Sequence, residues 1–138
     1  MTAVRDIMTS DPAYVDTSET VARAARLLAS EDIGSVPIRG EDKQLKGMLT
    51  DRDIVVKVLA EGKDPVAVHA GELAQGEVVS VTPDDDVEQA LAVMARHQIR
   101  RVPVVRDGEL VGIVAQADAA RTQPEQKTGA VVGSISQD

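Results

Sequence analysis

Two stretches of this chain carry a carboxylate in the same local pattern, and that pattern suits a ligand that bears hydroxyl groups. Residues 47–53 read GMLTDRD and residues 112–118 read GIVAQAD, so Asp53 and Asp118 occupy matching positions. A carboxylate can accept hydrogen bonds from two vicinal hydroxyls, and bonds to charged groups are worth roughly 1.5–3 kcal/mol. Thr50 falls where a helix is expected to begin. A phosphate there would also meet free backbone N–H groups and the positive end of the helix dipole.

The same residues also have a purely structural interpretation. Thr50 and Asp53 have the spacing of an N-cap and an acid at N3, which any helix beginning there could use. Asp118 is present although Ala115 stands where the capping threonine would be, so capping is not its whole explanation. Both roles can hold at once, and the sequence leaves both open.

Nearby arginines and prolines extend the candidate site. Arg52, Arg100 and Arg101 could supply positive charge to a phosphate, although they could equally be solvated surface residues, because exposed pairs contribute little. Pro37 and Pro103 are expected in the core, and proline restricts their strands to an edge or a strand end, where a ligand can approach. The candidate ligand-binding residues are therefore Thr50, Arg52, Asp53, Asp118, Arg100, Arg101, Pro37 and Pro103.

The chain offers few groups for catalysis or for metal binding. It has no cysteine, which excludes thiolate nucleophiles, disulfides and Cys-based metal sites. His69 and His97 have no partner at ligand spacing, and the acids at 84–86 are better interpreted as first-turn acids of a helix. No dinucleotide-binding, Walker A or nucleophile-elbow motif is present. We expect no catalytic residue, no metal and no enzymatic activity.

Composition narrows the class of protein further. The 138 residues suit one domain with a packed core. A net charge of −8 argues against a sequence-independent grip on DNA, and Tyr14 is the only aromatic residue available for stacking on bases. No stretch is long and apolar enough to span a membrane, and the N-terminus has no signal-peptide pattern. We therefore expect a cytoplasmic protein without a DNA or membrane partner.

An internal repeat organises the rest of the chain. An offset of 66 residues places Val15 on Val81 and Val36 on Val102, and after one deletion Gly47 falls on Gly112. A single 60-residue unit would be marginally stable, so packing two units together gives a structural reason for the duplication. The predicted boundaries are 1–61 for the first unit, 62–70 for a linker, 71–122 for the second unit and 123–138 for a tail.

Each copy is expected to fold as a βαββα unit. A short extended piece (13–15 and 78–81) precedes a helix whose apolar residues recur at 21, 24, 25 and 28, and at 87, 90, 91 and 94. The caps are expected at Asp16 with Glu19 and at Thr82 with Asp85. Two short strands follow, at 35–38 and 47–49 in one copy and at 102–105 and 111–114 in the other. The last helix runs from Thr50 to Gly62 in the first copy, and its counterpart begins near Ala115 and is shorter.

The repeat, its order and its motifs resemble the paired cystathionine-β-synthase (CBS) domain, also called a Bateman module, from about Val4 to Arg121. Residues 33–65 are particularly similar to small stand-alone actinobacterial CBS-pair proteins of the hypoxic-response type. The resemblance implies an α/β (α+β) fold in which two pseudo-twofold-related units pack through their sheets and leave two clefts. It also implies an adenosine ligand such as AMP, ATP or S-adenosylmethionine, with Asp53 on the ribose hydroxyls and Thr50 facing a phosphate.

These expectations lead to one functional hypothesis and one rival. The chain is expected to be a regulatory module that binds an AMP-, ADP- or ATP-like ligand, requires no cofactor, forms a homodimer through its helices and signals to an unknown protein partner in trans. Because Ala115 lacks the hydroxyl of Thr50, the cleft with Thr50 and Asp53 should bind a nucleotide better, by about 0.5–1.5 kcal/mol. The rival is a ligand-free protein–protein interaction module, in which these motifs are only caps and core.

Overall fold

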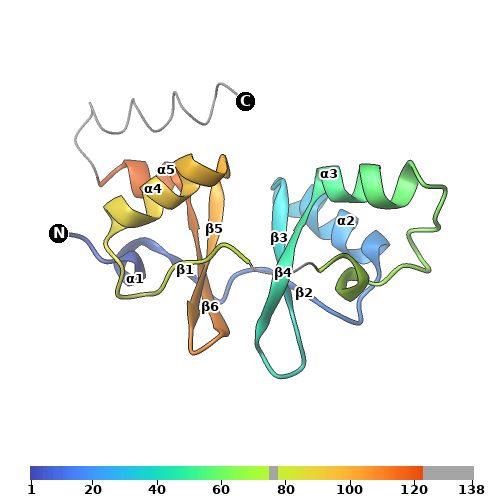
Figure 1. Ribbon diagram of the computed structural model, residues 1–138, viewed down its shortest axis with the longest axis horizontal. Coiled ribbons are helices and arrows are strands. Elements are labelled where there is room, and N and C mark those ends of the chain that lie inside the picture. Colours follow the sequence, from blue (N-terminus) through green and yellow to red (C-terminus); the bar gives the residue numbers. More distant parts are fainter. Residues whose placement is uncertain (75–77, 123–138) are drawn as a thin grey trace. The chain divides into compact units, whose positions relative to one another are not determined.

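The computed structural model describes residues 1–74 and 78–122. These residues form two compact units, and one of them combines two separate stretches of the chain. The first-repeat unit contains residues 13–74 and 78, and the second-repeat unit contains residues 1–12 together with 79–122. Each unit has its own three-stranded sheet, its own helices and its own hydrophobic core (Figure 1). Both sequence copies therefore fold as mixed α/β units, as predicted.

The first-repeat unit has strand order β2-β3-β4, with β2 parallel and β4 antiparallel to the central strand β3. Helix α2 lies against β3, and α3 continues into the π-helix η1. The elements are β2 (Val15–Asp16), α2 (Val21–Glu31), β3 (Ser35–Arg39), β4 (Leu45–Thr50), α3 (Asp51–Ile54), η1 (Val55–Leu59) and the 3-10 helix η2 (Ala70–Leu73).

The second-repeat unit has strand order β1-β6-β5, with both pairs antiparallel. Helices α4 and α5 contact each other as well as β5 and β6, respectively. The elements are α1 (Val4–Ile7), β1 (Thr9–Ser10), α4 (Val87–His97), β5 (Arg101–Arg106), β6 (Glu109–Ala115) and α5 (Gln116–Ala120). Among the described residues no helix is long and apolar enough to cross a membrane.

The internal repeat is confirmed in detail at the predicted offset. Helices α2 and α4 are both 11 residues long, and each ends at a residue in the left-handed conformation, Asp32 at φ 54° and Gln98 at φ 56°. The predicted apolar stripes form the helix–sheet cores, since all of their members are buried except the partly buried Ala25. The last helices begin where predicted, directly after Thr50 and Ala115.

The predicted caps of the first helices were wrong by one turn. Asp16 and Glu19 do form a bond, in which the Asp16 N–H donates to the Glu19 carboxylate at 2.9 Å. That bond closes a turn, and the residue that caps α2 is Thr20, whose hydroxyl accepts from the N–H of Arg23 at 3.1 Å. The turn precedes the helix, and its residues Thr17 and Glu19 accept backbone N–H groups of Gly71 and Ala70.

The second copy shows the same correction. The Thr82 N–H donates to the Asp85 carboxylate at 2.9 Å, but α4 begins at Val87 with Asp86 as its cap. Asp86 accepts from the N–H of Glu88 at 3.1 Å. The spacing rule therefore identified a real hydrogen-bonded turn in each copy and assigned it to the wrong position relative to the helix.

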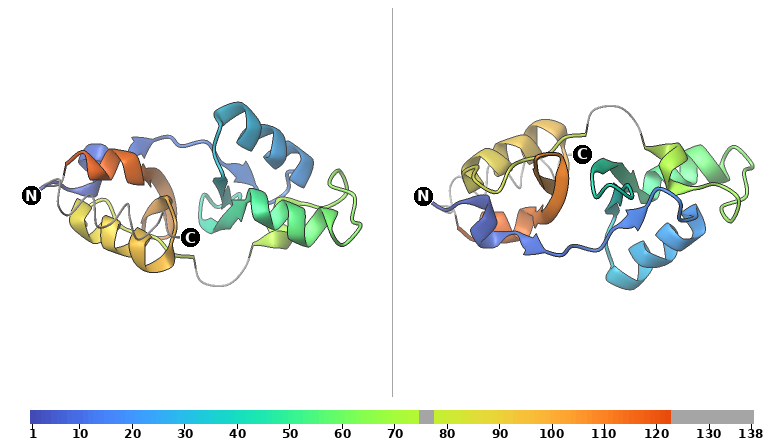
Figure 2. Two further views of the ribbon diagram at one scale, coloured as in Figure 1. Left: turned by 90° about the horizontal axis from the view of Figure 1, so that it is seen from above. Right: turned by 90° about the horizontal axis from the view of Figure 1, so that it is seen from below.

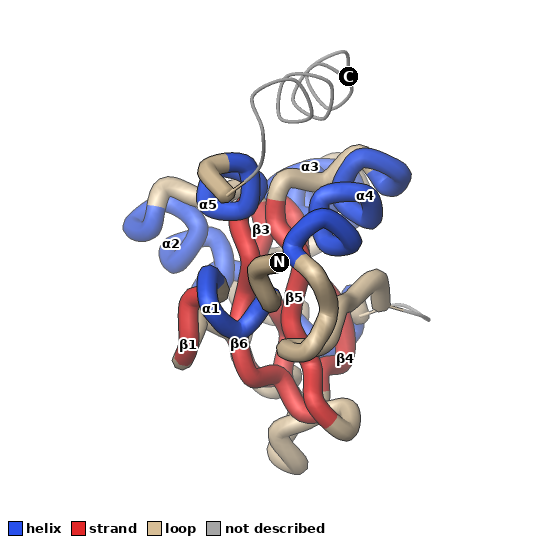
Figure 3. Tube along the Cα trace, turned by 90° about the vertical axis from the view of Figure 1, so that its left-hand side faces the viewer, coloured by secondary structure: helices blue, strands red, loops and turns tan. Residues whose placement is uncertain are grey.

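Residues 2–10, here called the N-terminal leader, pack against the second repeat. The N–H of Val4 donates to the carbonyl of Asp85 at 2.8 Å, and the N–H of Arg5 donates to the carbonyl of Pro83 at 3.0 Å. β1 then pairs with β6, and Figure 3 shows α1 and β1 beside that strand. Val4 is fully buried in this unit's core. The N-terminal leader is thus a structural part of the second-repeat unit.

Residues 68–74, here called the second leader, make the equivalent contacts with the first repeat. The N–H of Ala70 donates to the carbonyl of Glu19 at 2.8 Å, and the N–H of Gly71 donates to the carbonyl of Thr17 at 2.9 Å. Each repeat is therefore completed by the segment that precedes the other repeat in sequence. Figure 2 shows one half of this exchange, because the blue N-terminal segment lies beside the orange elements of the second-repeat unit.

The compact units consequently differ from the predicted domains. Residues 1–12 were placed with the first copy but pack with the second, and residues 71–74 belong with the first repeat rather than the second. The predicted linker 62–70 also contributes to the core, where Val68 and Ala70 are buried. The predicted tail, 123–138, lies outside the described residues.

The predicted location of proline at an edge or strand end holds for Pro103 but not for Pro37. Pro37 is the third residue of β3, the central strand of its sheet. The neighbouring strand β2 pairs only with Ile38 and Arg39, so pairing on that side begins after the proline. Its missing N–H therefore costs the sheet no bond there. Pro103 lies in β5, the outer strand of its sheet, where only Val81 bridges to the other side of the strand.

Candidate ligand-binding site

Thr50 and Asp53 form a reciprocal capping box where β4 passes into α3. The N–H of Asp53 donates to the Thr50 hydroxyl at 3.0 Å, and the N–H of Thr50 donates to the Asp53 carboxylate at 3.0 Å. The structural interpretation of this pair is therefore confirmed. The side chain of Asp53 remains 23% exposed, so its carboxylate is held in place and still accessible to solvent.

The expectation of free backbone donors at this helix start was wrong. The N–H of Asp51 donates to the carbonyl of Gly34 at 3.0 Å, and the N–H of Arg52 donates to the Asp51 carboxylate at 2.8 Å. With the N–H of Asp53 bound to Thr50, these donors of the first turn are already used. A phosphate at this position would have to be bound mainly by side chains.

A cation that the sequence analysis missed completes this cluster. The ammonium of Lys57, in η1, lies 3.4 Å from the Oδ1 atom of Asp53, and the lysine side chain is 37% exposed. The i, i+4 spacing of acid and base on a helix could have indicated the pair. One carboxylate oxygen of Asp53 thus meets a backbone N–H and the other faces an ammonium group.

The second-repeat unit holds its carboxylate differently. Asp118 lies in α5, whose cap Ala115 makes no side-chain hydrogen bond. The Asp118 Oδ1 atom instead accepts from the guanidinium of Arg121 at 2.7 Å, and the aspartate side chain is 39% exposed. Asp118 is therefore more exposed than Asp53, and its cap residue Ala115 has no hydroxyl. The unequal affinity of the two sites stays a prediction.

The remaining candidates divide between the two units. Arg52 is exposed in α3, and Arg100 is exposed just before β5, where its carbonyl accepts from the N–H of Gln116 at 2.7 Å. Arg101 is the first residue of β5 and pairs in register with Ala115. Pro37 and Pro103 are buried. The first-repeat unit brings together Thr50, Arg52 and Asp53, and the second-repeat unit contains Arg100, Arg101 and Asp118.

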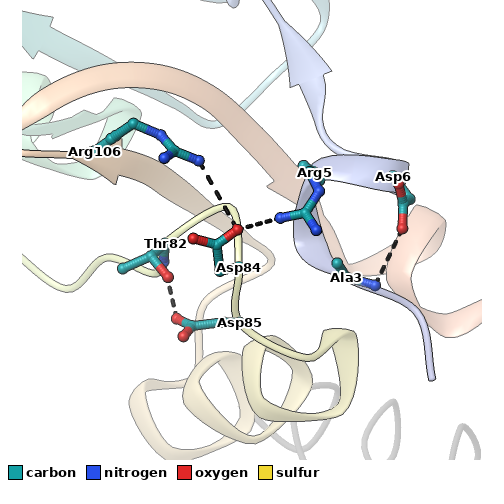
Figure 4. Close-up of polar contacts among 7 residues, drawn as sticks. All are labelled: Ala3, Arg5, Asp6, Thr82, Asp84, Asp85 and Arg106. Atoms are coloured by element: carbon teal, nitrogen blue, oxygen red, sulfur yellow. Dashed lines mark hydrogen bonds and ion pairs between the residues drawn. The ribbon is translucent and has the colours of Figure 1, made fainter.

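Two further polar clusters lie away from these carboxylates. Asp84 forms ion pairs with Arg5 of the N-terminal leader and, at 3.9 Å, with Arg106 of β5 (Figure 4). In the first-repeat unit the Arg39 guanidinium stacks 3.8 Å from the centre of the Tyr14 ring. Neither cluster had a local signal in the sequence, because the partners are distant along the chain. The Asp84 cluster joins the second repeat to the N-terminal leader, whereas the contact of Arg39 with Tyr14 lies within the first-repeat unit.

The CBS domain model matches residues 4–60 and 70–125 of this chain. The chain belongs to the CBS domain family. Two matches in tandem make it a CBS pair, a type of regulatory module, which confirms the family resemblance stated from the repeat, its order and its motifs. The CBS pair is 49% identical over 125 residues to Hypoxic response protein 1 of Mycobacterium tuberculosis, covering 91% of this chain and 87% of the relative.

Solved structures of three relatives agree with this fold. The crystal structure of Hypoxic Response Protein I with two coordinated zinc ions has a TM-score of 0.82 at 48% identity, covering 89% of this chain and all of that one. CBSX2 in complex with AMP has a TM-score of 0.75 at 25% identity, with 88% and 96% coverage. The CBS pair of protein MJ0100, in complex with 5-methylthioadenosine and S-adenosyl-L-methionine, has a TM-score of 0.74 at 31% identity, with 88% and 95% coverage.

Proposed function

We propose that this CBS pair is a non-catalytic sensor of an adenosine-containing ligand and that Asp53 and Asp118 bind the ribose hydroxyls. The observation that carries the proposal is the contrast between the two carboxylates. Asp53 both caps its helix and remains accessible, whereas Asp118 persists without any capping bond. Capping therefore does not explain why both positions hold a carboxylate. The exposed ion pair of Asp118 with Arg121 adds little stability either.

Two relatives support the choice of ligand class. CBSX2 was crystallised with AMP, and the CBS pair of MJ0100 with two adenosine derivatives. The part that these ligands share is the adenosine group, whose ribose carries vicinal hydroxyls. In this proposal Arg52 provides positive charge near a ligand at Asp53, and Arg100 and Arg101 provide it near a ligand at Asp118. Pro37 and Pro103 are buried within their own units.

We do not extend the zinc ions of Hypoxic Response Protein I to this chain. The sequence has no cysteine and only two histidines, and zinc sites in proteins rely mainly on those residues. His69 already lies 3.3 Å from the Glu72 carboxylate, and the described residues contain no group of three potential metal ligands. The donor set of this chain therefore does not fit such a site.

A homodimer is the second part of the proposal. Three apolar side chains of η1 are exposed, namely Val55 at 55%, Val56 at 44% and Leu59 at 53%. Clustered exposed apolar residues on one helix favour an interface with another chain. Sedimentation at several concentrations should give twice the chain mass for the wild type and the single chain mass for Val56→Asp. A wild type that sediments as a monomer throughout would contradict the dimer without affecting the ligand proposal.

A thermal-shift screen tests the ligand proposal. AMP, ADP, ATP, NAD(H) and S-adenosylmethionine are each added to the full chain, and a ligand at 100 times its Kd should stabilise the fold by about 2.7 kcal/mol. We expect at least one adenosine ligand to raise the melting temperature of the wild type but not of the double variant Asp53→Ala, Asp118→Ala. If none of them shifts the melting temperature, the ligand-free interaction module becomes the better account.

A further inference from the structure

The helix start at Thr50 offers a phosphate no free N–H group from Asp51, Arg52 or Asp53. The N–H groups of Asp51, Arg52 and Asp53 already have acceptors, at 3.0, 2.8 and 3.0 Å. Any anionic part of a ligand at this position must therefore be neutralised by side-chain cations.

Lys57 is the cation best placed for that task. Its ammonium group lies 3.4 Å from the Asp53 Oδ1 atom, while the Oδ2 atom of the same carboxylate accepts the Thr50 N–H at 3.0 Å. The ammonium is thus separated from the threonine by a single carboxylate. A lysine side chain has a flexible four-carbon stem and three donors, so a small rotation carries the charge from Asp53 towards a group beside Thr50.

The charges of this segment show why the lysine matters. Asp51 and Asp53 contribute two negative charges, and Arg52 and Lys57 contribute two positive ones. Without Lys57 the segment would carry a net negative charge, which would repel a phosphate. An uncharged ligand such as adenosine would not experience that repulsion, so the lysine affects the two kinds of ligand differently.

The second repeat has no equivalent of this lysine. At the offset of 65 residues that aligns Asp53 with Asp118, Thr122 stands in the place of Lys57. The cation beside Asp118 is Arg121, one residue earlier, and its side chain is 74% exposed. A lysine at this position is therefore found in the first repeat and not in the second.

We propose that Lys57 makes the first-repeat site selective for phosphorylated over unphosphorylated adenosine ligands. The inference rests on the proposed adenosine binding. Without ligand, Lys57 neutralises Asp53. When the ribose hydroxyls bind the Asp53 carboxylate, the ammonium turns to the phosphate beside Thr50. Lys57 is therefore a specificity-determining residue of this site rather than only a member of a surface ion pair.

Titration calorimetry with adenosine and with AMP tests this role. All variants carry Asp118→Ala, so that the first-repeat site dominates the signal. Lys57→Met should lower the affinity for AMP about tenfold, because a charge-assisted bond is lost, and should leave the affinity for adenosine within about twofold. Lys63→Met is the matched control, since Lys63 is an exposed lysine of the same unit that pairs with Glu61 at 3.3 Å. It should change neither affinity.

The possible outcomes separate the two proposals. Equal loss of AMP and adenosine affinity in Lys57→Met would overturn the inference, because the lysine would then act only by holding Asp53. If Lys57→Met loses neither affinity, the inference is overturned as well. If the parent protein binds neither compound, adenosine binding itself fails and the inference fails with it. Lys57→Arg keeps the charge and should retain the preference for AMP, which guards against an effect of Lys57→Met on folding.

Discussion

Val4 and Ala70 are equivalent residues of the two leaders, and each is fully buried in the core of the other repeat. Their N–H groups make the same bond, at 2.8 Å, to Asp85 and Glu19 respectively. The duplicated chain thus does not form two independent folding units in sequence order. Each repeat depends on a segment from outside its own boundaries. A substitution in a leader should therefore destabilise the repeat against which that leader packs.

Shortening Val4 tests that dependence. Val4→Ala removes buried methyl groups and leaves a cavity, so we expect the free energy of unfolding in urea to fall by about 1.5–3 kcal/mol. Hydrogen exchange should show the loss of protection in residues 79–122 before residues 13–74. Val66→Ala is the control, because Val66 is 66% exposed and its truncation should change stability by less than about 0.5 kcal/mol. Loss of protection confined to residues 13–74 would contradict the exchange of leaders.

Gly71 tests the fit of the second leader. A Cβ added there would lie 2.9 Å from the Thr17 Cβ atom and 3.0 Å from its carbonyl oxygen, and a backbone oxygen cannot move aside cheaply. Gly71→Ala should destabilise the protein by about 1–3 kcal/mol in urea denaturation. Gly34→Ala is the control, since its nearest contact would be an ordinary 3.6 Å to Asp51. Equal stability of the two variants would show that the leader is loosely packed.

Much of this fold could be predicted from the sequence because it depends on local periodicity. The apolar stripe that begins at Val21 and its copy at Val87 identified both core helices, and the equivalence of Val36 and Val102 identified the strands. The exchange of leaders could not be predicted, because a backbone hydrogen bond such as that from Val4 to Asp85 does not depend on which side chains the two residues carry. The turn at Asp16 was mistaken for the helix cap because its bond to Glu19 has the spacing of a capping box.

The candidate site was predictable in its residue types but not in its bonding. Thr50 and Asp53 were identified from the motif, and the structure confirms their capping bonds. The sequence did not reveal that Gly34 accepts the N–H of Asp51, because the pairing of β3 with β4 extends beyond the strand ends that we predicted. This contact shifts the expected phosphate partners from the backbone to side chains such as Lys57.

Substitution of the two carboxylates should have unequal effects. Asp53→Ala removes a capping bond and an ion pair, so we expect a stability loss of about 0.5–2 kcal/mol. Asp118→Ala removes an exposed pair with Arg121 and should cost less than about 1 kcal/mol. In calorimetric titrations with AMP, Asp53→Ala should also lose more binding than Asp118→Ala. Equal losses of affinity would contradict the unequal sites.

Glu72 gives the second leader a dependence on pH. Its carboxylate accepts the N–H of His69 at 2.7 Å, and this bond, with a smaller contribution from the His69 ring, lowers the pKa of Glu72 below its ordinary value of 4.5. A carboxyl whose pKa is lowered by folding stabilises the protein above its unfolded pKa, and the effect is lost as the pH falls through the folded pKa.

The stability difference between the wild type and Glu72→Gln should therefore shrink as the pH falls below about 4.5. Urea denaturation at about pH 6, 5, 4 and 3 measures this difference. Glu61→Gln is a suitable control, because Glu61 pairs only loosely with Lys63, at 3.3 Å and exposed. A difference that grows on acidification would mean that the bond to His69 does not stabilise the ionised carboxylate.

The position of the ligand tests the whole account most directly. In a backbone-amide NMR titration of the full chain with AMP, we expect the largest shift changes in residues 47–57, with smaller ones in residues 112–121. Saturable changes at Thr50 and Asp53 that vanish in Asp53→Ala would place the adenosine group at the first-repeat carboxylate. An unchanged spectrum at millimolar AMP, or saturable changes confined to residues outside both stretches, would contradict the account.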